Sequence, residues 1–124
     1  MMETRYDLIN RTRAFGKQII ILSTNIVRSP VTNPLIIQCV RAGTSVGANY
    51  AEANGASSVS DFRNKISLCK KECQETEYWL LMLEDMIKDT FAFQSAKQEC
   101  HELVLIFNKI LKTLNEKYNK RSVN

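Results

Sequence analysis

Apolar side chains recur every third or fourth residue along nearly the whole chain, which is the spacing of an α-helix that buries one face. The longest series is Phe62, Ile66, Cys69, Cys73, Thr76, Leu80, Leu83 and Ile87. The others are Leu8, Thr12, Phe15, Ile19, Leu22 and Ile26; Ile36, Cys39, Gly43, Val46, Tyr50 and Ala53; and Cys100, Leu103, Phe107, Ile110 and Leu114. A half-buried strand would instead alternate at every second residue. The pattern therefore predicts four amphipathic helices.

Helix-breaking residues are scarce, with 4 Gly and 2 Pro in 124 residues. Helices are predicted at about 4–28, 34–54, 58–88 and 94–119. We expect Asn33 to cap the second helix, Ser58 with Asp61 to cap the third, and Ser95 with Gln98 to cap the fourth. Phe91-Ala92-Phe93 is then expected in the last connection, and Gly55 is expected to end the second helix in a left-handed conformation.

Gly43 and Gly47 lie one turn apart inside the second predicted helix. Each glycine there costs up to about 1 kcal/mol relative to alanine. We therefore expect another backbone to approach this face. Four long helices joined by short connections predict an all-α fold, an up-and-down antiparallel four-helix bundle, formed as a single domain by residues 1–124.

The apolar runs are too short to span a membrane, which needs about 20 residues. The polar start of the chain does not resemble a secretory signal. We therefore expect a cytoplasmic protein with no membrane association. Its four cysteines are expected to stay reduced.

Basic residues are concentrated near the two ends of the chain, although the formal net charge is only +4. The start of the first helix and the end of the fourth lie at the same end of an up-and-down bundle. One basic rim is therefore expected, formed by Arg11, Arg13, Lys17, Lys109, Lys112, Lys117 and Lys120. Such a rim would bind the phosphate backbone of RNA or DNA with little dependence on sequence. The alternative is a solvated surface with no binding role.

The third predicted helix carries a second apolar stripe, Trp79, Met82 and Met86, beside its main series. A contiguous apolar surface of this kind is typical of a protein interface. We expect a homo-oligomer with these residues in its interface, and the alternative is a monomer with a wide core.

Polar residues align on one face of the second predicted helix, at Arg41, Ser45, Asn49 and Glu52, and on the third helix at Glu72 and Glu75. An arginine suits a partly buried carboxylate, so we expect Arg41 to bind Glu75 or Glu72. These six residues are predicted to form a structural polar network. A functional polar site between the helices is the alternative.

No pattern of catalytic residues is present. His101 is the single histidine and lacks the Glu-x-x-His spacing of di-iron bundles. Cys69 and Cys73 share a helix face but belong to the core series, where cysteine acts as a small apolar residue. No phosphate-binding or dinucleotide motif occurs. The sequence predicts no enzyme activity, no metal, no cofactor and no small-molecule substrate.

The segment from Gln38 to Ala53 and the start and middle of the third helix resemble the 23S rRNA intervening-sequence protein family. The family pattern is R-A-x-x-S-[IV]-x-x-N-x-A-E-G, followed by S-x-x-[DE]-F and E-x-E. The matching residues are Arg41, Ala42, Ser45, Val46, Asn49, Ala51, Glu52, Phe62, Glu75 and Glu77. Ala53 stands where the family has glycine.

This resemblance implies a homopentameric barrel of bundles. It also implies kinship in fold with the accessory variability determinant protein of diversity-generating retroelements, a basic pentamer that works with a reverse transcriptase and RNA. The leading hypothesis is a non-enzymatic, homo-oligomeric scaffold that binds RNA, DNA or a nucleic-acid enzyme through its basic end. The alternative is a protein–protein adaptor with no nucleic-acid role, and a metal-binding or enzymatic bundle ranks below both.

Overall fold

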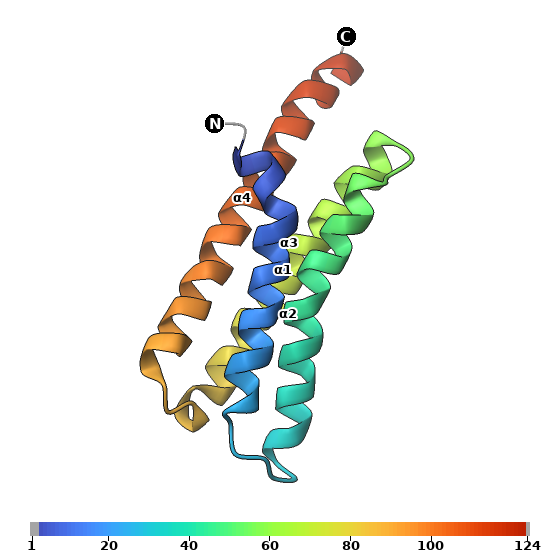
Figure 1. Ribbon diagram of the computed structural model, residues 1–124. Helices are drawn as coiled ribbons and strands as arrows, with labels where there is room; N and C mark the ends of the chain where they lie inside the picture. The colour runs from blue at the N-terminus through green and yellow to red at the C-terminus, as the bar shows by residue number, and fades with distance from the viewer. Residues whose placement is uncertain (1–2, 124) are drawn as a thin grey trace.

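A computed structural model of the protein describes the backbone of residues 3–123 and the side chains of residues 7–118 (Figure 1). Four α-helices follow one another along the chain: α1 (Glu3–Thr24), α2 (Thr32–Asn54), α3 (Val59–Leu83) and α4 (Thr90–Val123). A short 3₁₀ helix, η1 (Glu84–Met86), follows α3. The described backbone contains no strand. The predicted all-α, up-and-down four-helix bundle is confirmed.

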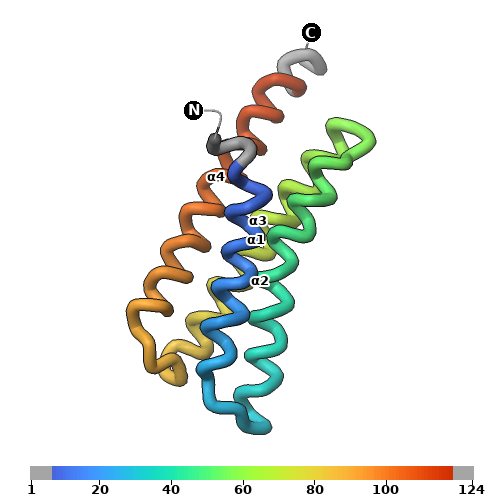
Figure 2. Tube along the Cα trace, viewed as in Figure 1, coloured from blue at the N-terminus to red at the C-terminus, as the bar shows by residue number. Residues whose placement is uncertain are grey.

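Each helix runs antiparallel to the one before it, and the chain returns so that α4 lies beside α1 (Figure 2). α2 and α3 pack against each other most extensively, whereas α1 and α4 pack least extensively among the neighbouring helices. The bundle is therefore closed least tightly between its first and last helices.

The predicted apolar series form the core. Phe15, Ile19, Val46, Leu80 and Phe107 are all fully or almost fully buried. In α4 the series is buried through Phe107, but Ile110 and Leu114 are only partly covered. The reason is length, because α4 extends past the start of α1 and loses that neighbour (Figure 1).

The glycines bring α1 and α2 close together, as their spacing predicted. A Cβ atom at Gly47 would lie 3.3 Å from the backbone carbonyl carbon and oxygen of Thr12. A Cβ atom at Gly43 would lie 2.9 Å from two side-chain carbons of Ile19. Hydrogen atoms in place of these Cβ atoms allow the close helix–helix packing.

Two predictions about the α1–α2 connection are wrong. α1 ends at Thr24 rather than near residue 28, and the backbone N–H groups of Asn25 and Ile26 bind carbonyls only three residues back, those of Leu22 and Ser23. α2 begins at Thr32 without a cap from Asn33. Ser29 takes over the capping, since its hydroxyl accepts hydrogen bonds from the backbone N–H groups of Val31 and Thr32 at 3.2 and 3.0 Å.

The α2–α3 turn is partly as predicted. Ser58 caps α3, where its hydroxyl accepts a hydrogen bond from the N–H of Asp61 at 3.0 Å. Gly55 does not adopt the expected left-handed conformation, because its φ is −101°. Its N–H instead binds the carbonyl of Glu52 at 3.1 Å, which closes the turn without a positive φ.

The α3–α4 connection also differs from the prediction. α3 ends at Leu83, before η1, and α4 begins at Thr90 rather than 94. Asp89 caps α4 in place of Ser95, since its carboxylate accepts a hydrogen bond from the N–H of Ala92 at 3.0 Å. Phe91-Ala92-Phe93 therefore forms the first turn of the helix, where Phe93 is buried and Phe91 is 81% exposed.

Candidate functional site

The polar residues of α2 and α3 meet around Arg41. Its guanidinium donates hydrogen bonds to Glu72, at 3.3 Å, and to Glu75. Gln38 accepts a further bond from Arg41 Nε at 3.0 Å, and the indole N–H of Trp79 donates to Glu75 at 3.1 Å. The two carboxylates are partly covered, while the Arg41 side chain is 44% exposed. The arrangement ties the middle of α2 to α3 at the protein surface.

The other three members of the predicted network do not join this cluster. Ser45 donates to the carbonyl of Arg41 at 2.7 Å, and Asn49 donates to the carbonyl of Ser45 at 2.9 Å, so both bind their own helix. Glu52 pairs with Lys65 of α3 at 2.7 Å, away from Arg41. The six residues therefore divide into the Arg41 cluster, two hydrogen bonds within α2 and a separate ion pair. Ser45 and Asn49 bind their own helix because their short side chains reach the carbonyls of the preceding turn first.

We expect the substitution Arg41→Ala to lower the free energy of unfolding by about 0.5–1 kcal/mol, because a half-exposed ion pair is screened by water. This is less than the few kcal/mol that a buried pair would give. Hydrogen bonds from Trp79 and then Arg41 lower the pKa of Glu75. This contribution is therefore present above the usual glutamate pKa and is lost as the pH falls through the lowered value.

Urea titrations of Arg41→Ala at neutral and acidic pH measure this effect, with Arg13→Ala, at an exposed arginine on α1, as the control. An equal loss for both variants, or a loss that does not shrink in acid, would contradict it.

A second ion-pair cluster joins α1 to α4. Arg11 binds Glu99 through two hydrogen bonds of 2.7 and 2.8 Å and binds Glu102 at 2.9 Å. Gln98 donates to the other oxygen of Glu102 at 3.0 Å. Glu99 raises the pKa of Arg11 further by hydrogen bonding to the charged form. Arg11, which the sequence analysis places in the nucleic-acid-binding rim, is thus held by two carboxylates of α4.

The predicted basic rim is not one surface. The Arg11–Glu99 contact and a 3.3 Å contact between Gln18 and Ser95 align the two helices. Lys17 therefore lies at the level of Ser95, which is 14 residues, or about 21 Å, below Lys109 on α4. The error arose because sequence alone does not give the register between the first and last helices.

Exposed lysines remain at the end of α4. Lys109, Lys112 and Lys117 are all exposed, and Glu116 lies among them. The Lys117 ammonium is 5.4 Å from the centre of the Tyr118 ring. The side chain of Lys120 lies outside the described residues. Arg13 is exposed on α1 and borders a groove of about 350 Å³ against α2.

The predicted apolar stripe on α3 is divided. Trp79 is partly buried and packs edge-on against Tyr78, with ring centres 5.0 Å apart. Met82 and Met86 are 50% and 52% exposed, and Tyr78 is exposed beside them. An apolar surface thus remains uncovered at the end of α3 and on η1.

The four cysteines are free and buried. Burial raises the pKa of Cys39 and of Cys69 to about 12, and it raises the pKa of Cys73 and Cys100 as well. Thiols held in this protonated form are poor nucleophiles at neutral pH. Among the described residues, no group of three or more His, Cys, Asp or Glu side chains is placed to hold a metal ion. His101 is exposed on α4.

No helix in the described part of the chain is long and apolar enough to cross a membrane. Comparison with curated proteins gave no match. Among solved structures, the chain is similar to a protein of unknown function from the S23 ribosomal protein family of Bacteroides thetaiotaomicron VPI-5482. The two are 32% identical with a TM-score of 0.77, and the match covers 85% of this chain and 98% of that one.

The family model of the 23S rRNA-intervening sequence protein matches residues 4–109. This range includes the Arg41 cluster and most of all four helices. It ends where α4 begins to extend past α1. The chain therefore belongs to the 23S rRNA-intervening sequence protein family.

Proposed function

We propose that this protein is a non-enzymatic, homo-oligomeric scaffold that binds RNA or DNA through the C-terminal part of α4. One observation carries the proposal: α4 extends past the start of α1 and presents Lys109, Lys112 and Lys117 to solvent. Ammonium groups on a projecting helix can approach a phosphate backbone without obstruction. Arg11, Arg13 and Lys17 are not included, because Arg11 is paired and the other two lie farther down α1.

Self-association is the second part of the proposal. Tyr78, Met82 and Met86 leave apolar surface exposed on α3 and η1, and burial of such surface favours association. A pentamer is the state that the family resemblance implies. A cytoplasmic location remains part of the proposal, since four unpaired thiols suit a reducing compartment.

The double variant Lys109→Glu/Lys112→Glu should bind a single-stranded RNA oligonucleotide more weakly than the unmodified protein. The affinity of the unmodified protein should fall steeply with salt and vary little between RNA sequences, because binding neutralises phosphates. The double variant should also show a smaller slope of log K against log salt, by roughly 0.7 for each phosphate that it no longer neutralises. Fluorescence anisotropy at several salt concentrations measures both quantities.

The matched control is Arg28→Glu/Lys88→Glu, which changes the net charge equally at the opposite end of the bundle. Both of its residues are exposed. Light scattering at micromolar concentration establishes the oligomeric state of each sample, and a monomer would contradict the second part of the proposal. Absence of binding at low salt with an intact oligomer would favour the protein–protein adaptor instead.

A further inference from the structure

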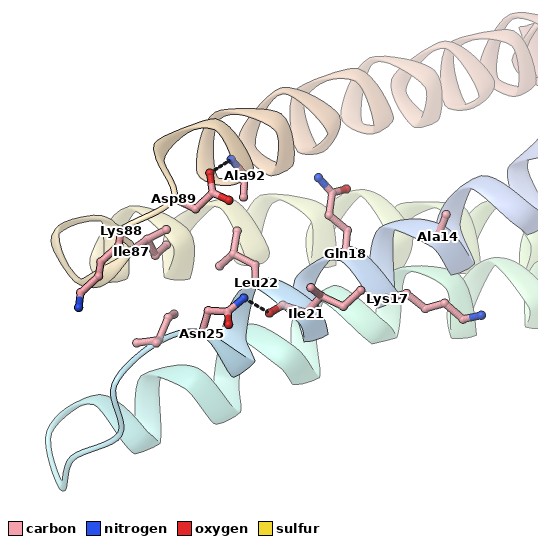
Figure 3. A pocket seen from close by; sticks show the side chains of 11 residues that line it. Ala14, Lys17, Gln18, Ile21, Leu22, Asn25, Ile87, Lys88, Asp89 and Ala92 are labelled. Atoms are coloured by element: carbon pink, nitrogen blue, oxygen red, sulfur yellow. Dashed lines mark hydrogen bonds between the residues drawn. The ribbon is translucent and has the colours of Figure 1, made fainter.

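A groove of about 740 Å³ runs between α1 and the beginning of α4 (Figure 3). Its apolar wall consists of Ala14, Ile21, Leu22, Ile26, Ile87 and Ala92. Ile21 is 64% exposed there. Leu22, Ile26 and Ile87 are buried and form the floor of the groove, so the apolar surface that the bundle does not cover is that of Ile21, with Ala14 and part of Ala92.

The groove follows from the loose packing between α1 and α4. Arg11 and Gln18 each bind α4, through Glu99 and Ser95 respectively. Small Ala14 and Ala92 leave the space between the helices unfilled. The core beneath is complete, because Phe15 and Ile19 are almost fully buried. The groove is therefore a surface feature and not a defect of the core.

Some polar residues at the border of the groove make hydrogen bonds within the protein, and others form no ion pair. Asn25 donates to the carbonyl of Ile21 at 3.3 Å, and the Asp89 carboxylate caps α4 through Ala92. Lys17 and Lys88 are exposed and form no ion pair with any residue among 7–118. The Asp89 carboxylate keeps its negative charge while it caps α4, so the two lysines leave the border of the groove with a net positive charge.

The two lysines lie at opposite ends of the apolar wall, and their ammonium groups point apart (Figure 3). Lys88 and Asn25 both line the end of the groove opposite Lys17 (Figure 3), and Asn25 is eight residues, or about 12 Å at the rise of a helix, from Lys17. Groups this far apart do not converge on a single carboxylate or phosphate. A helix with acidic residues about eight positions apart could contact both, because such residues share a helix face.

The length of the wall also suits a helix. It begins at Ala14 and continues to Ile26, past the end of α1 at Thr24, so its helical part alone is about 15 Å or nearly three turns long. We propose that this groove binds an amphipathic helix of a partner protein, whose apolar stripe enters the groove and whose acidic side chains meet Lys17 and Lys88. The groove is distinct from the lysines at the end of α4, so this inference does not depend on nucleic-acid binding.

The probe is a fluorescein-labelled 18-residue helical peptide with leucines at i, i+4, i+7 and i+11 and two glutamates eight positions apart on the same face. A second peptide carries lysine in place of both glutamates. Anisotropy with the full-length protein at low salt should give an affinity about three- to tenfold higher for the glutamate peptide. This range corresponds to two exposed ion pairs.

Charge exchange makes the test specific. Lys17→Glu/Lys88→Glu should reverse the preference, so that the lysine peptide binds more tightly. Ile21→Asp should weaken both peptides at least tenfold. Ile37→Asp should leave both unchanged, since Ile37 is similarly exposed but lies on α2, outside the groove. These side chains are exposed, and circular dichroism checks that each variant is folded.

Several results would overturn the inference: equal affinity for the two peptides, no reversal in the charge-exchange variant, or equal effects of Ile21→Asp and Ile37→Asp. Absence of binding by either peptide would also overturn it, including when the groove is covered by a second copy of the chain. RNA binding by the same protein samples is measured separately. Failure of the groove inference and failure of the nucleic-acid proposal are thus distinguishable.

Discussion

Phe107→Ala is expected to lower the free energy of unfolding by about 3–5 kcal/mol, because removal of a fully buried ring leaves a cavity that its neighbours fill only in part. Phe107 has no exposed surface, and its ring centre lies 6.3 Å from that of Tyr50 on α2. The loss is a large share of the roughly 5–15 kcal/mol that stabilises a typical domain. The melting temperature should fall by about 10–20 °C.

Phe91→Ala is the matched control on the same helix, because Phe91 is 81% exposed. Its effect should stay within about 0.5 kcal/mol. Urea titration of both variants measures the difference, and the dependence on urea should be unchanged if both unfold in one step. Similar losses for the two variants would mean that the core is not arranged as described.

Gly43→Val is expected to cost about 1–3 kcal/mol, because an overfilled core forces side chains from their preferred rotamers or moves the helices apart. A Cβ atom alone would already lie 3.0 Å from the Ile19 Cβ, next to the α1 backbone. Ile19 is fully buried and has no free direction in which to turn. Gly43→Ala should also destabilise the protein, although alanine favours helix by about 1 kcal/mol over glycine.

The control is Gly55→Ala, where a Cβ atom would meet no atom closer than 3.8 Å and φ is −101°. This substitution should be neutral or slightly stabilising. Combining Gly43→Ala with Ile19→Val should recover part of the loss, because valine removes a carbon from the crowded site. Strict additivity of the two effects in a double-mutant cycle would contradict direct contact between these residues.

Helix capping illustrates where local sequence was sufficient and where it was not. Ser58 was identified correctly, although Ser57 and Ser60 lie close by, because Ser58 is the serine three residues before Asp61. Asn33 and Ser95 were equally reasonable caps, but Ser29 and Asp89 hold those positions. Local patterns indicate which residues are able to cap, and packing of the adjoining turn selects one of them. Burial of Phe93, for example, accompanies the start of α4 at Thr90.

The two arginine clusters also differ in how far the sequence could predict them. The polar face of α2 that carries Arg41 and the carboxylates on α3 pointed to the contact with Glu72 and Glu75, because an arginine suits a partly buried carboxylate. Nothing near Arg11 pointed to Glu99, which is 88 residues away. Several carboxylates on the later helices could have served an arginine at that position.

The sequence by itself determined the four helices, their buried faces and their antiparallel order, because these depend on periodicity and on short connections. The tertiary structure alone decided the register of α1 against α4, and with it the pairing of Arg11 and the exposure of the α4 lysines. The presence of the groove beside Ile21 also depends on how α1 and α4 pack. Helix periodicity is a local property repeated every 3.6 residues, whereas the register of α1 against α4 is fixed by contacts such as Arg11 with Glu99 that exist only after the helices have packed.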